Sequence, residues 1–111
     1  GEQHVVYEVF PDGAVQPYRF TFVRTKTFAV WKVHKWTRGR WRPTDGRHEP
    51  YRLAELLKIK CRFAIALPEA KRIARAHIRE RRENARRIWR EADCATQALH
   101  EVEEPRRTKK P

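Results

Sequence analysis

Seven cations recur between residues 68 and 99 at the spacing of one helix face: Lys71, Arg72, Arg75, Arg79, Arg82, Arg86 and Arg90. At about 100° per residue they fall within roughly 100° of one another. Like charges four residues apart repel each other by about 0.2–0.5 kcal/mol per pair. We therefore interpret this set, called the cationic row below, as a surface for phosphates. The alternative is a solvated Arg/Glu face of a long helix.

A second group of arginines surrounds one tryptophan in the stretch 37–50. Its members are Arg38, Arg40, Trp41, Arg42 and Arg47. Two glycines and two prolines in this stretch predict a loop without regular structure. Trp41 in a flexible loop can stack on a base or enter a groove of a nucleic acid. It can equally fold onto the core as a lid, and both interpretations stay open.

The cationic row requires a long helix, predicted from Pro68 to about Leu99. The segment has no glycine and no internal proline, and Ala, Arg and Glu are good helix formers. Pro68 suits the first helical position. A separate apolar stripe runs along the helix, with Arg81 as its misfit: Ala70, Ala74, His77, Ile78, Ala85, Ile88, Ala92, Ala95 and Leu99. If the helix extends beyond the sheet, the segment 81–99 could pair with a second copy as a homodimer.

Three strands are expected before this helix, over residues 4–10, 15–24 and 27–37, because β-branched and aromatic residues alternate with polar ones. Pro11-Asp12-Gly13 predicts a tight turn. We expect an antiparallel meander with one face against the long helix and the other left to solvent or a partner. Residues 51–57 predict a short helix. For 58–66 a fourth strand is favoured over a continued helix.

The sequence thus predicts an α+β fold. An antiparallel sheet of three strands, or four, is followed by a short helix and one long basic C-terminal helix. We expect a single domain over 1–100 and a flexible charged tail over 101–111.

The composition favours an anionic partner. The 111 residues include 26 Lys and Arg against 14 Asp and Glu, a net charge of +12, for which nucleic acid is the commonest reason. No apolar run is long enough to cross a membrane. Two cysteines make no disulfide framework, and the N-terminal residues do not resemble a secretion signal. The expected location is cytoplasmic, with nucleoid association as the alternative.

Catalytic and metal-binding patterns are missing from the sequence. We find no phosphate-binding glycine-rich loop, no nucleophile elbow and no His-Glu-x-x-His motif. Cys61, His77, Cys94 and His100 lack the close ligand pairs of a zinc site, so buried cysteines are expected instead. The prediction is a protein that is not an enzyme and needs no cofactor or metal.

The leading hypothesis is a nucleic-acid-binding protein that contacts backbone phosphates, with duplex DNA favoured and structured RNA next. Arginine suits bidentate phosphate contacts. Low sequence specificity is expected, because Asn and Gln, which read base edges, are scarce. The alternative is a small inhibitor or assembly factor, as mobile elements encode, that uses its basic surface on an acidic protein or nucleoprotein complex. Trp41 and Trp89 would be its anchors.

Overall fold

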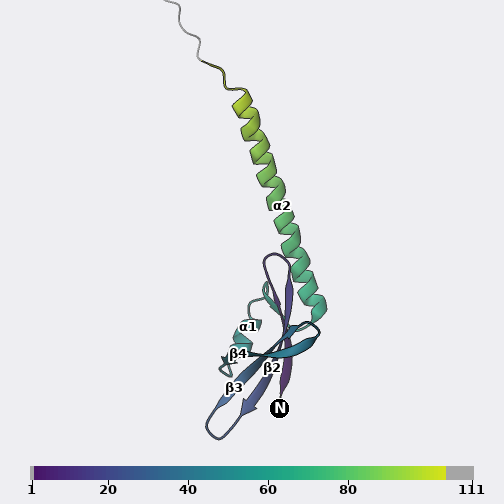
Figure 1. The fold of residues 1–111 in the computed structure, drawn as a ribbon, viewed down its shortest axis with the longest axis vertical. Coiled ribbons are helices and arrows are strands. Elements are labelled where there is room, and N and C mark those ends of the chain that lie inside the picture. The colour runs from purple at the N-terminus through teal and green to yellow at the C-terminus, as the bar shows by residue number, and fades with distance from the viewer. Residues whose placement is uncertain (1, 105–111) are drawn as a thin grey trace, which may run out of the picture. The chain divides into compact units, whose positions relative to one another are not determined.

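A computed structural model describes residues 2–104 of the chain. The chain divides into two units, residues 1–79 and 80–111, and each is described by itself. The predicted single domain over 1–100 with a tail over 101–111 stays a prediction. In chain order (Figure 1) the elements are β1 (Gln3–Val9), β2 (Val15–Arg24), β3 (Ala29–Thr37), β4 (Arg40–His48), α1 (Arg52–Leu57), β5 (Phe63–Ala64) and α2 (Leu67–His100).

The first unit is built on one antiparallel sheet with the strand order β4-β3-β2-β1-β5. The predicted α+β fold and its meander of three strands are confirmed. The turn predicted at Pro11-Asp12-Gly13 is also present. The Asp12 carboxylate accepts a hydrogen bond from the Ala14 amide over 2.9 Å, and Gly13 has a φ of 89°, which glycine adopts without strain.

One face of the sheet packs against α1. The aromatic side chains of β2 lie on this face. The buried core there draws on β1, β2, β3, α1 and β5, and its members are Val6, Phe20, Trp31, Val33, Leu53 and Phe63. Tyr18 and Phe22 are partly buried against this core. The Trp31 indole N–H donates to the Pro50 carbonyl over 3.0 Å, just before α1 begins. This contact satisfies the one polar group of an otherwise apolar side chain.

The opposite face receives the first turns of α2 at its β1 and β5 side. The buried residues there are Val9, Ala64, Ala70, Ile73 and Ala74. Small alanine side chains let the helix backbone approach the sheet closely. The expectation that one whole face would be left to solvent or a partner is therefore wrong, because α1 of the same chain packs on that face. The part of the sheet that no helix covers lies instead on the face against which α2 packs, over β2, β3 and β4.

The stretch 37–50 is not a loop, contrary to the prediction. It forms a hairpin turn at Arg38 and Gly39, with φ of 50° and 78°, followed by the nine-residue strand β4. Proline and glycine are tolerated there for two reasons. β4 is an edge strand, and a bulge shifts its register between Lys32 and His34 of β3. Edges and bulges are where sheets accept both residue types.

The favoured strand over 58–66 is also mostly wrong. Only Phe63 and Ala64 pair with β1, opposite Glu8 and Tyr7. The preceding residues form turns, in which the Arg62 and Phe63 amides donate to the Ile59 carbonyl. The reason is topological. These nine residues carry the chain from α1 on one face, past the edge of β1, to α2 on the other face.

The second unit is the remainder of α2 from Glu80 to His100, followed by residues 101–104. The predicted bounds of the long helix are confirmed to within a residue at each end. Every residue from Arg79 to Glu104 is exposed. Cys94 is therefore exposed, and so is Cys61 in the turns before β5, so the expectation of buried cysteines is wrong. Most of the predicted tail, residues 105–111, lies outside the described residues.

Candidate nucleic-acid interface

The cationic row lies on α2, as predicted, and all seven of its side chains are exposed. Lys71, Arg72, Arg75 and Arg79 belong to the first unit, and Arg82, Arg86 and Arg90 belong to the second. Arg72 differs from the rest, because its Nε donates to the Glu69 carboxylate over 3.0 Å. This hydrogen bond lowers the pKa of Glu69 and raises the pKa of Arg72.

The other six cations of the row form no ion pair in the part of the chain that the structure describes. The ion pairs found there are His4–Glu2, Arg52–Glu55, Arg62–Glu8 and Arg72–Glu69. In each unit, the three unpaired cations can donate hydrogen bonds to an anion without breaking an internal contact. This property makes the row suitable for phosphates.

The arginines predicted to share a loop are divided between the two faces of the sheet. Side chains alternate along a strand. Arg40 and Arg42 therefore lie on the sheet face that α1 covers, whereas Trp41 and Arg47 lie on the opposite, open face of the sheet. The pairing places Arg42 opposite Lys35 and Arg47 opposite Lys32. Arg38 lies in the hairpin turn. The five residues therefore do not form one site.

Trp41 belongs to an aromatic and cationic group on the open face of the sheet. It pairs with Trp36 across β3 and β4, and the two rings meet edge to face with centroids 5.2 Å apart. The guanidinium of Arg19 lies over the Trp41 ring, 5.3 Å from its centroid. Both earlier interpretations assumed a mobile loop, and the half-buried position of Trp41 on a strand corrects them.

His34 completes this group, because it pairs with Arg19 across β2 and β3. We call Arg19, His34, Trp36 and Trp41 the Arg19 cluster. The Nε atom of Arg19 and the Nδ1 atom of His34 are both buried, and neither has a hydrogen-bond partner among the described residues. Trp36 remains 41 % exposed. The cluster therefore offers polar and aromatic groups to a ligand at the surface.

Sequence reasoning missed Arg19 and did not assign Trp36 to the site. A signal was present, because Arg19 lies between Tyr18 and Phe20 and so must point away from the aromatic face of β2. Trp31, by contrast, lies on the opposite face of the sheet from Trp36 and belongs to the core, where it is only 6 % exposed. The distance between Arg19 and Trp41 depends on the pairing of three strands, which the sequence does not specify.

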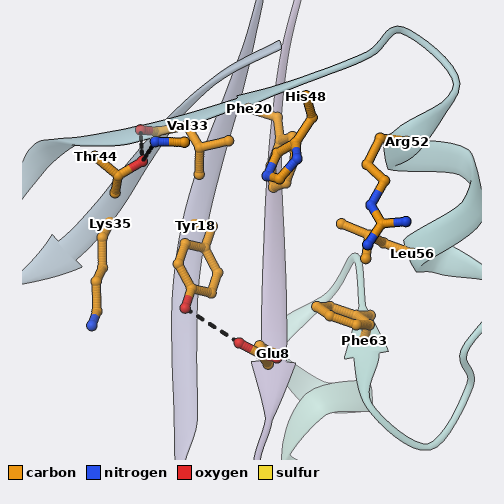
Figure 2. Close-up of a pocket in the computed structure, with 11 residues that line it drawn as sticks. Glu8, Tyr18, Phe20, Val33, Lys35, Thr44, His48, Arg52, Leu56 and Phe63 are labelled. Carbon is orange, nitrogen blue, oxygen red and sulfur yellow. Dashed lines mark hydrogen bonds between the residues drawn. The ribbon is translucent and has the colours of Figure 1, made fainter.

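A pocket of about 400 Å³ lies on the other face, between the sheet and α1 (Figure 2). Its base holds Glu8, which is 7 % exposed. The Glu8 carboxylate accepts hydrogen bonds from the Tyr18 hydroxyl at 3.2 Å and from Arg62 Nε at 2.8 Å. Burial and the charge of Glu8 raise the pKa of Tyr18. Because two donors already hold the carboxylate, Glu8 is poorly placed to act as a general base.

His48 and Thr44 line the same pocket from β4. The His48 ring stacks on Phe20 with centroids 5.8 Å apart, as Figure 2 shows. Burial, and next the charge of Arg52, lower the pKa of His48. The Thr44 hydroxyl donates to the Val33 carbonyl over 2.8 Å and accepts from the Gly46 amide over 3.1 Å. These side chains hold the bulge of β4 in place.

Within residues 2–104, no three His, Cys, Asp or Glu side chains gather where they could hold a metal ion. His77 lies at the boundary of the core of α2, with its Nε2 2.8 Å from the Cys61 carbonyl. No helix in these residues combines the length and the apolar character needed to span a membrane. The absence of catalysis stays a prediction.

Comparison with models of known families, with curated proteins and with solved structures finds no match to this chain.

Proposed function

We propose that this protein binds nucleic acid through backbone phosphates, with duplex DNA favoured over structured RNA. One observation carries the proposal, namely that six exposed cations of the cationic row have no ion-pair partner in the described residues. They are Lys71, Arg75 and Arg79 in the first unit, and Arg82, Arg86 and Arg90 in the second.

Arg72 is the one cation of the row that forms an ion pair in the described residues, so it can be compared with the six that form none. A glutamate three residues before it is within reach, and the two side chains form an ion pair. Glu83 likewise lies three residues before Arg86, but these two side chains form no ion pair in the described residues. Arg82, Arg86 and Arg90 repeat at intervals of four, so each repels the next. A row of phosphates lying across these arginines would remove that repulsion. Their guanidinium groups are suited to bidentate contacts with phosphate oxygens.

The Arg19 cluster supports the same function from the first unit. Trp36 is an exposed aromatic ring on an open sheet face, and the paired residues Lys32 and Arg47 are exposed cations farther along the same face. An aromatic ring among cations can stack on an unpaired base while the cations hold the backbone. The cluster and the row are separate contacts, and neither contains a pattern for one sequence of bases.

Low sequence specificity follows from the shortage of residues that read base edges. Asn84 is the only Asn or Gln between Pro68 and Arg90. Its side-chain oxygen already accepts a hydrogen bond from Arg87 over 3.3 Å. Phosphate contacts position a protein on a nucleic acid but do not distinguish sequences. A cytoplasmic or nucleoid-associated location would be consistent with this function.

The test is fluorescence anisotropy with labelled duplex DNA, single-stranded DNA and duplex RNA at about 50 to 200 mM salt. Each arginine that neutralises a phosphate of duplex DNA contributes about 0.9 to the slope of log affinity against log salt. Arg86→Gln should therefore reduce the slope by about 0.9, and Arg82, Arg86 and Arg90 together by about 2.7. Arg87→Gln is the matched control and should change the slope less, because at about 100° per residue Arg87 shares a face with Glu80, Glu83 and Glu91 and not with the cationic row.

Equal slopes for wild type and the triple variant would contradict the assignment of the row. Weak binding to all three polymers would contradict the function itself. The alternative of an inhibitor or assembly factor acting on an acidic protein would then be favoured. The observation behind this alternative is Trp89, which is 71 % exposed in the second unit and has arginines on either side in the sequence.

A further inference from the structure

The second unit carries an apolar stripe that the described residues leave uncovered. The stripe consists of Ala85, Ile88, Ala92, Ala95 and Leu99. Ile88 is 61 % exposed and Leu99 is 72 % exposed, and the three alanines are exposed as well. Exposed aliphatic side chains aligned on one helix face are typical of a surface that another helix covers.

The spacing of this stripe is that of a two-helix seam. Its members follow one another at steps of three, four, three and four residues, and Arg81 and Val102 continue the same alternation at either end. A period of 3.5 residues keeps such a seam facing a partner helix over several turns. Isolated helices are marginal in water even when their sequence favours them, so a partner would stabilise this one.

The charge of the second unit decides between possible partners. Residues 81–90 hold five arginines and one glutamate, a net charge of +4. Residues 91–104 hold five carboxylates and no lysine or arginine, a net charge of −5. The segment is therefore complementary to itself when it is reversed. A parallel pair would instead place the basic half on the basic half.

We propose that residues 81–102 pair with the same segment of a second copy of this chain, as an antiparallel two-helix coiled coil. Centred on Arg90, this register sets Ile88 opposite Ala92 and Ala85 opposite Ala95 of the second copy. The two central layers, Ile88 with Ala92 and Ala85 with Ala95, each hold at least one alanine, which allows the two helix backbones to approach closely there. The larger Ile88 occupies the space that Ala92 leaves.

This arrangement also accounts for Arg81, the misfit of the apolar stripe. In the antiparallel register Arg81 meets Leu99 of the second copy, just before the carboxylates of Glu101 and Glu103. The aliphatic part of Arg81 can cover the leucine while its guanidinium reaches the acidic turn. In a parallel pair, Arg81 would face Arg81 across the seam. Arg86 and Arg90 lie off the seam and stay available for phosphate.

Sedimentation equilibrium of the full chain, without nucleic acid and at physiological salt, measures the pairing. The wild-type chain should be a dimer. Ala95→Glu places a carboxylate in the seam and should raise the dimer dissociation constant by more than about 100-fold. Gln97→Glu adds the same charge on the outer face of the helix and should leave it within about threefold. Circular dichroism of both variants shows whether the first unit stays folded.

Cross-linking tests the orientation of the two helices. In a chain whose Cys61 and Cys94 are replaced by serine, Ala85→Cys and Ala95→Cys are made separately and then mixed under oxidising conditions. The antiparallel register predicts disulfides between the two variants and few within either one alone. Disulfides of each variant with itself would indicate a parallel pair and overturn the proposal. A wild-type chain that is monomeric throughout, with its helix intact, would also overturn it, whatever the result with nucleic acid.

Discussion

The guanidinium of Arg19 lies over the ring of Trp41, 5.3 Å from its centroid, although the two residues belong to strands that do not pair with each other. Arg19 on β2 reaches across β3 to β4, and Trp36 on the intervening strand β3 meets the same Trp41 ring edge to face. The result is a cation held on an open sheet face by aromatic contacts, with no carboxylate partner among the described residues.

Trp41→Ala should destabilise the first unit by about 1–3 kcal/mol, because it removes the contact with Arg19 and the edge-to-face pair with Trp36. Urea denaturation followed by circular dichroism measures the free energy of unfolding. Trp41→Phe keeps an aromatic ring and should cost less than the alanine variant. If both variants cost the same, the Arg19 contact with the ring contributes no stability.

Trp36→Ala should weaken binding of single-stranded DNA more than binding of duplex DNA. Trp36 is 41 % exposed, whereas Trp41 is half-buried beneath Arg19, so Trp36 is the ring that an unpaired base can reach. Loss of one stacked base costs about 1–3 kcal/mol, or roughly 5- to 150-fold in affinity. Anisotropy with both polymers at one salt concentration measures the difference. Equal losses on the two polymers would exclude base stacking at this ring.

Gly13→Ala should destabilise the first unit by about 2–3 kcal/mol, more than Gly39→Ala at about 1 kcal/mol. Both glycines have positive φ, 89° and 78°. A Cβ at Gly13 would clash with Cγ1 of Ile78, whereas one at Gly39 would meet nothing within 4 Å. The difference in destabilisation between the two variants therefore measures the steric cost of a Cβ where the β1–β2 turn packs against α2. Ile78→Ala should rescue part of the Gly13 effect and none of the Gly39 effect.

The long helix and the meander could be predicted from the sequence, because each has a strong local signal. No Gly or Pro occurs from Glu69 to the end of the helix at His100, and tight turns separate the strands. β4 could not be predicted in this way. Pro43 and Gly46 break a strand in most positions, and they are tolerated here only because β4 is the edge strand and carries a bulge, which are properties of the assembled sheet.

The same limit applies to the candidate site. The cationic row follows from helical periodicity alone, and each of its residues is helical and exposed in the structure, whereas its role as a binding site stays a prediction. The Arg19 cluster depends on the register of three strands, which joins residues 22 positions apart in the chain through the pairing of Arg19 with His34 and of Trp36 with Trp41. Because residues 37–50 were predicted to form a loop, Trp41 was not expected to pair with Trp36, and the cluster could not be recognised.

Arg62→Met should destabilise the first unit by about 1–3 kcal/mol, because it leaves the buried Glu8 carboxylate with the Tyr18 hydroxyl as its one remaining partner in the described residues. The Arg62 side chain is 57 % exposed, so the cost is smaller than for a fully buried pair. In a Glu8→Leu background the same substitution should cost less than about 0.5 kcal/mol. A double-mutant cycle by urea denaturation gives the coupling energy, and additive effects would contradict the ion pair.

The stability of the first unit should fall as the pH drops from about 7 to about 5, in part because of His48. Burial, and next the charge of Arg52, lower the pKa of His48 below its ordinary 6.5 in the folded state. Above that ordinary value, His48 is neutral in both states and contributes no pH dependence. Below it, the unfolded chain takes up the proton first, so stability is lost until the pH falls through the folded pKa.

His48→Phe keeps a ring stacked on Phe20 and removes this titration. Urea denaturation at half-unit steps of pH should therefore give a smaller loss of stability for His48→Phe than for the wild type. Parallel curves for the two proteins would show that His48 is equally easy to protonate in the folded and unfolded chain.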